Sequence, residues 1–205
     1  MASFVETTPA VTEQVFKKRP VTVYTATLIV SAAITAVLGT LGSVVFPFLG
    51  PISSFYPGVA FQVSFGIWFG LWGAIGGGWI GPFIGLLLAG TAVPLAAAIA
   101  VGDFAQSFIP MLAFRLGKVN PELKTKKDWA VHIAVNVIFA QAVGATIGAG
   151  SLAAYGIFPW SVFPIAWLGW FGSNVVVVAI ITTILLKVFS GYLGKTALYV
   201  QGYTS

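Results

Sequence analysis

The sequence contains no cysteine and a single histidine, His132. The absence of cysteine excludes disulfides, thiolate metal sites and cysteine nucleophiles. One histidine likewise excludes a metal or haem site built from several histidines of the chain. The P-loop pattern GxxxxGK[ST] is also missing, so the chain is not itself an ATPase of that kind. No paired carboxylates or Ser/His arrangement lie in the apolar segments, so we expect neither an enzyme nor a bound cofactor.

Charge is equally scarce. Charged residues make up 7% of the chain and hydrophobic residues 58%, whereas a soluble domain carries about 25% charged residues. Residues 21–102 contain no charged side chain. No soluble core segment is that long, so the sequence predicts an all-α, multi-pass protein of the cell membrane. The net charge of +5 comes from short basic clusters beside apolar runs. This pattern is typical of cytoplasmic loops and does not suggest nucleic-acid binding.

The apolar runs predict a bundle of six transmembrane helices within residues 21–187, between tails at 1–20 and 188–205. The expected helices are 21–46, 57–73, 76–91, 93–114, 129–155 and 161–186, with hinges at the glycines 76–78 and at 90–94. Basic clusters occur at 17–19, 115–127 and 187–195. Six crossings place all three clusters on one side, so we expect both tails in the cytoplasm.

Asp103 is the only acidic residue between Glu13 and Glu122, and it lies within an apolar segment. A carboxylate at membrane depth costs at least about 2.5 kcal/mol, so it usually faces a polar interior or a partner. Gln106 and Ser107 follow at helical spacing and share its face. This face predicts the polar side of a cavity or an interface. The same residues also fit a helix start, with Asp103 as the N-cap and Gln106 reaching back to it.

Other polar and aromatic residues belong to the outer half of the predicted bundle, beneath the loops at 47–57 and 155–164. Apolar walls with a few placed polar groups are typical of small-molecule sites. The alternative is that the tryptophans form an interfacial belt and the amides only bridge helices. The candidate binding residues are Asp103, Gln106, Gln141, Trp167, Trp170, Asn174, Tyr56 and Gln62.

Small residues form two stripes. Gly73, Gly77, Gly81 and Gly85 are each four residues apart, which on one helix gives a bare ridge for a neighbour. If the glycines at 76–78 form a turn, the ridge is an accident of spacing. In the first apolar segment Ala32 and Ala36 are also four residues apart.

In length, predicted topology and the alanine pair, the chain resembles the substrate-binding S component of an energy-coupling-factor (ECF) transporter. Residues 55–88, FYPGVAFQVSFGIWFGLWGAIGGGWIGPFIGLLL, are similar in texture to the second and third helices of that family. The resemblance implies capture of a vitamin-like micronutrient from the outer side of the bilayer. It also implies that Ala32 and Ala36 contact a transmembrane coupling subunit, and that two ATPase subunits supply the energy. The glycine ridge is a second small-residue surface at least as strong, which departs from the family pattern.

Two other functions fit the same sequence. The chain would then be a structural or interaction subunit of a larger membrane complex, or a membrane sensory domain of the MASE1 type. In either case the glycine ridge would pack against other chains and Asp103 would cap a helix or pair with a partner.

Overall fold

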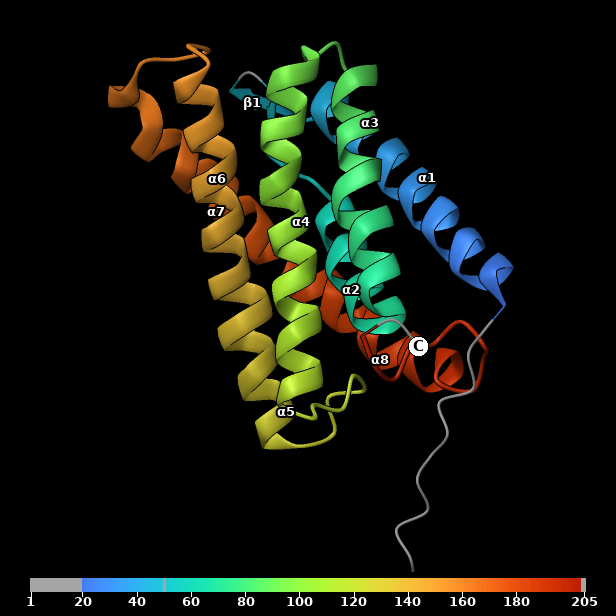
Figure 1. Ribbon diagram of the computed structural model, residues 1–205. Coiled ribbons are helices and arrows are strands. Elements are labelled where there is room, and N and C mark those ends of the chain that lie inside the picture. Colours follow the sequence, from blue (N-terminus) through green and yellow to red (C-terminus); the bar gives the residue numbers. More distant parts are fainter. Residues whose placement is uncertain (1–19, 50, 204–205) are drawn as a thin grey trace, which may run out of the picture.

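The computed structural model describes residues 20–49 and 51–203, and its described part is mainly helical (Figure 1). The N-terminal basic cluster 17–19 lies outside the described residues. Two short antiparallel strands, β1 (Pro47–Leu49) and β2 (Ile52–Ser53), form a turn after the first helix. The helical elements are α1 (Val21–Val45), α2 (Gly58–Ile75), η1 (Gly76–Ile80), α3 (Gly81–Leu88), α4 (Val93–Leu116), α5 (Lys126–Val131), η2 (His132–Phe139), α6 (Ala140–Ala154), η3 (Trp160–Val162), α7 (Phe163–Val177), η4 (Val178–Thr182) and α8 (Thr183–Leu193).

Several of these elements continue directly into one another. In the described chain five helices are long and apolar enough to cross a membrane: Val21–Val45, Gly58–Leu88, Val93–Leu116, Lys126–Ala154 and Trp160–Leu193. This arrangement fits a multi-pass membrane protein. The last helix extends to Leu193, seven residues beyond the predicted helix end at residue 186.

The predicted hinge at residues 76–78 is wrong, because the helical segment Gly58–Leu88 is broken at Gly70 and not at these glycines. Gly76–Ile80 instead forms a π-helical turn that continues into α3. The backbone leaves the helical conformation at Gly70, where φ is 63° and ψ is −142°. Residues with a Cβ atom rarely adopt this backbone conformation, so the position requires glycine.

The chain reverses its direction at Gly70. A Cβ atom at Gly66 and one at Gly78 would both meet Ser107, although a straight helix would hold these two glycines about 18 Å apart. Phe65 likewise lies against both Gly73 and Gly77. Residues 58–69, here called the first arm, therefore lie antiparallel to residues 71–88, the second arm (Figure 1).

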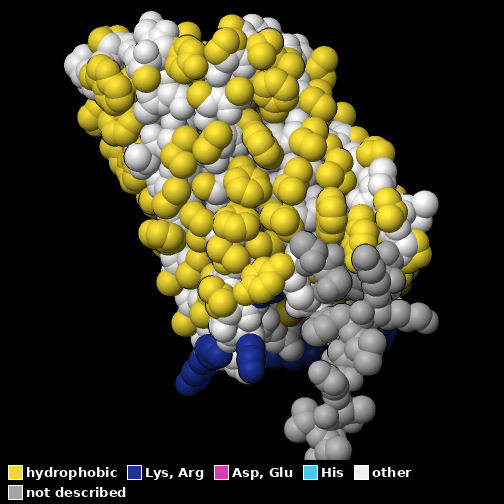
Figure 2. Space-filling view, viewed as in Figure 1, with side chains coloured by type: hydrophobic (Ala, Val, Ile, Leu, Met, Phe, Trp, Pro, Cys, Tyr) yellow, Lys and Arg dark blue, Asp and Glu magenta, His cyan; other side chains and the backbone are white. Residues whose placement is uncertain are grey.

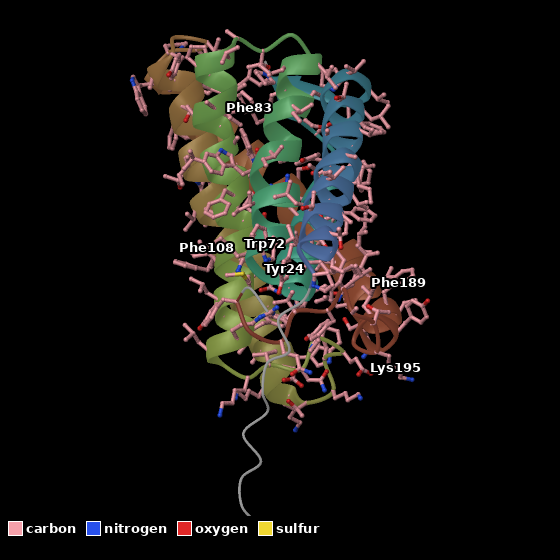
Figure 3. All side chains as sticks on the ribbon, turned by 45° about the vertical axis from the view of Figure 1, so that its right-hand side comes forward. Tyr24, Trp72, Phe83, Phe108, Phe189 and Lys195 are labelled. Carbon is pink, nitrogen blue, oxygen red and sulfur yellow. The ribbon has the colours of Figure 1, made fainter. Side chains whose placement is uncertain are left out.

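The C-terminal half of the glycine ridge, Gly81 and Gly85, packs against α1. A Cβ at Gly81 would lie 2.6 Å from the Ala32 carbonyl oxygen, and one at Gly85 would lie 2.9 Å from that of Ala36. The two backbones approach this closely only because the glycines have no side chain. Near the other end of the contact, the rings of Tyr24 and Trp72 stack with centroids 5.2 Å apart (Figure 3).

Basic side chains gather at one end of the molecule, which carries the loop between α4 and α5 (Figure 2). We call this the basic end. The surface between the two ends is largely hydrophobic in the same view. The strand turn β1–β2 and the loop between α3 and α4 lie at the opposite end (Figure 1).

Residues 198–203, here called the C-terminal strap, lie across the reversal at Gly70. The Val200 amide donates to the Trp68 carbonyl and the Leu71 amide donates to the Tyr203 carbonyl, both at 2.8 Å. The Arg115 guanidinium stabilises the contact between the strap and the first arm. It donates to the carbonyl oxygens of Ile67 (2.6 Å), Val200 (2.7 Å) and Gly202 (2.9 Å). The strap thus covers the backbone groups that the reversal leaves without helical partners.

Candidate functional site

A cavity lies between α1, the loop at 46–57, α3, α4 and α7, toward the end of the molecule opposite the basic end. Its empty volume is about 460 Å³, part of which is open to the surroundings. The enclosed space itself is only about 40 Å³, so a small organic molecule would enter it only if the loop at 46–57 or the lining side chains move outward. The polar and aromatic lining consists of Ser43, Ser53, Tyr56, Asp103, Trp170 and Asn174, and the wall is completed by Gly39, Pro51, Ile52, Pro82, Leu86 and Ile99.

Of the eight candidate binding residues, four line this cavity: Tyr56, Asp103, Trp170 and Asn174. They come from four different parts of the chain, and the fold brings them to one place. Their role in binding a ligand stays a prediction. Sequence reasoning did not single out Ser43, Pro51, Ile52 or Ser53 as lining residues, although the proline and serine content of 47–57 indicated a loop over the site.

Asp103 lies in the middle of α4, which begins after the cap residue Ala92 and is unbroken to Leu116. The alternative interpretation of Asp103 as an N-cap is therefore wrong. The side chain is only 4% exposed, and its Oδ1 atom has no hydrogen-bond partner within the described structure. The Gln62 side chain hydrogen-bonds the carboxyl group. The Asp103 carboxyl group is thus hydrogen-bonded to Gln62, while its Oδ1 atom is unpaired.

Gln62 connects Asp103 to Tyr56. Its Nε2 atom donates to the Tyr56 hydroxyl at 2.6 Å, and its backbone carbonyl accepts a hydrogen bond from the Ser107 hydroxyl, also at 2.6 Å. The Tyr56 ring lies against three glycines, Gly39, Gly42 and Gly58. The Tyr56 hydroxyl is therefore a hydrogen-bonding group at the cavity wall.

The two predicted tryptophans of α7 lie in different surroundings. The Trp170 indole is 9% exposed and packs directly over Gly148 of α6 while lining the cavity. Trp167 does not line the cavity. Its Nε1 atom donates to the Thr146 hydroxyl at 2.9 Å, and its ring stacks on Phe171 with centroids 4.7 Å apart.

Gln106 and Gln141 are fully buried and do not line the cavity either. Gln106 lies one turn further along α4 than Asp103, packed over Gly144, and neither its Oε1 nor its Nε2 has a partner. The Gln141 Nε2 atom donates to the Asn136 carbonyl at 2.9 Å, while its Oε1 is unpaired. His132 belongs to a separate set of contacts, with Thr183 and Asn136, both at 2.9 Å.

Two residues that line the cavity have an unpaired buried polar atom, Asp103 at Oδ1 and Asn174 at Nδ2. Proteins normally pair almost all such atoms with protein groups or ordered water, so each exception calls for an explanation. A ligand that supplies the missing partners explains those that face the cavity. The other unpaired buried atoms among the described residues belong to side chains that do not line it: Ser31 Oγ, Gln62 Oε1, Gln106 Oε1 and Nε2, Asn136 Oδ1, Gln141 Oε1 and Ser173 Oγ.

No family model, curated protein or solved structure matches the chain. The function is therefore argued from the fold and the cavity.

Proposed function

We propose that the chain is the substrate-capture subunit of a membrane transporter, of the ECF S-component kind, and that it binds a small vitamin-like solute in this cavity. The observation that carries the proposal is the pairing of an aromatic-walled cavity with buried, unpaired polar atoms of Asp103 and Asn174. Sites for small organic molecules combine apolar walls with a few placed polar groups in this way.

The proposed topology has six crossings, with each arm of the hairpin at Gly70 counted separately. The second arm is about 27 Å long, close to the thickness of the hydrocarbon core of about 30 Å, whereas the first arm is only about 18 Å long. The first arm therefore stops short of one membrane surface. The loop 46–57 and the cavity occupy the space that it leaves.

The positive-inside rule assigns the basic end to the cytoplasm. The cavity then lies toward the outer side of the cell membrane, where a capture subunit needs it. The supporting feature is the gathering of lysine and arginine at the end opposite the strand turn (Figure 2).

A transmembrane coupling subunit and ATPase subunits belong to the proposal as partners, together with the lipid bilayer. Ala32 and Ala36, which the resemblance implied as the coupling surface, are each 6% exposed and are covered by Gly81 and Gly85. Contact through this pair requires α1 and α3 to separate. The outward residues of α1, among them Ile29, Val30 and Val37, present an alternative surface.

The alternative of an interaction subunit or a MASE1-type sensory domain depended on the glycine ridge as a surface for other chains. That ridge is covered within the same chain, at Gly81 and Gly85 by α1 and at Gly73 and Gly77 by Phe65 of the first arm. The alternative therefore loses the free glycine surface on which it depended.

The proposal is tested by native mass spectrometry and thermal unfolding of the detergent-purified chain. We expect one small molecule to accompany each chain, or one class within a panel of water-soluble vitamins, amino acids and amines to raise the Tm. Asn174→Leu keeps the side-chain size but removes the amide from the cavity wall, and we expect it to abolish the effect. Thr146→Val, which removes a polar group outside the cavity, is the control. A folded protein with no bound molecule and no stabilising solute contradicts the proposal.

A further inference from the structure

We propose that the ligand of this cavity is a small organic cation with a flat ring, whose charged group pairs with Asp103. The inference rests on the proposed capture function and names the chemical class of its substrate. It follows from the charges, the free atoms and the rings that meet at the cavity wall.

The cavity wall carries one acidic side chain and no basic one. In the described part of the chain, the one ion pair is formed by Lys124 and Glu122, in the loop at the basic end. Arg115 is on the same helix as Asp103 but about 18 Å further along it. Its guanidinium donates hydrogen bonds to three backbone carbonyls. Asp103 therefore has no cation of its own within the described chain.

A buried carboxylate without a cation is costly, and a positively charged ligand group would offset that cost. An ammonium or amidinium group supplies both the positive charge and N–H donors. The free Oδ1 atom is the acceptor for such a donor, because Gln62 holds the carboxyl group from the other side. An anionic ligand would meet the uncompensated Asp103 charge, so carboxylates and phosphates are disfavoured.

The rings of Tyr56 and Trp170 favour the same class. Both line the cavity, and an aromatic face attracts a cation placed over it. A flat ring of the ligand can stack on the indole. Asn174 Nδ2 has no partner and is available to donate to an acceptor atom of the ligand ring. The combined site fits a heteroaromatic amine better than an aliphatic one.

The test compares three probes that share an indole ring and differ in the end group of the side chain. Tryptamine carries an ammonium group, tryptophol a hydroxyl and indole-3-propionate a carboxylate. A second set uses a pyridine ring with the same three end groups. Binding is measured by calorimetric titration and by the shift in Tm of the full chain in detergent. We expect the cations to bind in preference to the alcohols, and the carboxylates not to bind.

Asp103→Asn keeps the size of the side chain and removes its charge. We expect it to weaken cation binding by about 30-fold or more, as loss of one partner of a buried ion pair does. Asp103→Glu, which keeps the charge, should retain the preference for the cation over the alcohol even where its Tm falls. Glu122→Gln removes the same charge at the basic end, away from the cavity, and should change the affinity by less than about twofold.

Binding of the alcohols or carboxylates with equal affinity in wild type and Asp103→Asn overturns the inference and leaves the capture function standing. Failure of every probe to bind or to raise the Tm overturns the cation class. If the broader solute panel also fails, the capture function falls with it.

Discussion

At the scale of single residues, the rings of the cavity wall pack closely on glycines. Tyr56 lies against Gly39, Gly42 and Gly58, and Trp170 lies over Gly148. The sequence identified Asp103 because it is the only acid in a long uncharged stretch. It could not show that Gln62 and Tyr56 hold the carboxyl group, because these residues reach it only after the chain reverses at Gly70. The spacing of Trp167 and Trp170 places them on one face of a helix. In the structure, however, Trp167 contacts Thr146 and Phe171 and does not line the cavity.

Gly148→Ala tests how the cavity wall is positioned. A methyl group at this position would collide with the Trp170 indole, so the ring has to move. Overpacking of this kind costs about 1–3 kcal/mol, and about 1.4 kcal/mol lost from the bound state lowers affinity about tenfold. Titration of the cation probe measures the loss. Gly150→Ala, on the same helix with open space around it, should bind as wild type does. Equal affinity in the two variants would show that Trp170 does not form the binding wall.

Gly70→Ala tests the reversal between the arms. Alanine is strained at φ 63° and ψ −142°, and its methyl would also meet the Tyr203 carbonyl. We expect a loss of unfolding free energy of about 1–3 kcal/mol or more. Denaturant unfolding in mixed micelles measures it, with Gly172→Ala, which has open space, as the control. If Gly70→Ala were as stable as Gly172→Ala, the backbone at Gly70 would have to be helical.

At the scale of helices, the sequence predicted a glycine-based hinge but placed it wrongly. The consecutive glycines Gly76, Gly77 and Gly78 resemble a turn, yet each is used for a close approach, to Leu28, Phe65 and Ser107 respectively. The reversal occurs instead at Gly70, which has no other turn-forming residue beside it. Local turn propensity could not distinguish a bend from a packing surface, because both require the same residue.

Gly81→Ala tests the contact between α1 and the second arm. The methyl group would collide with the Thr35 hydroxyl and approach the Ala32 carbonyl. Forcing the two helices apart should cost about 1–3 kcal/mol of unfolding free energy. The same micelle unfolding assay applies. A stability equal to wild type would mean that the ridge does not pack on α1.

Arg115→Met tests the C-terminal strap. The substitution keeps much of the side-chain volume but removes the donors to three carbonyls, each hydrogen bond from a charged group contributing about 1.5–3 kcal/mol. We expect the strap to open, so that carboxypeptidase shortens the variant faster than wild type. Lys126→Met, an exposed residue at the same end, is the control. Identical digestion of both variants would show that Arg115 does not hold the strap.

At the scale of the whole molecule, composition alone predicted a helical multi-pass membrane protein, because no other environment accommodates so long an uncharged run. The position of the cavity could not be predicted in this way. It depends on the short first arm, which leaves room beneath the loop 46–57, and hence on the location of a single reversal. The proposed orientation depends on the gathering of basic residues at the other end (Figure 2).

The central claim is that the cavity receives its ligand from the outer side of the membrane. Because the chain has no cysteine, Ser43→Cys places a single thiol on the cavity wall. A membrane-impermeant thiosulfonate reagent added to intact cells should modify this cysteine, and the bound cation should slow the modification. Lys124→Cys, at the basic end, should react only after the cells are opened. Reaction of Lys124→Cys in intact cells, with Ser43→Cys reacting only in opened cells, would contradict the account.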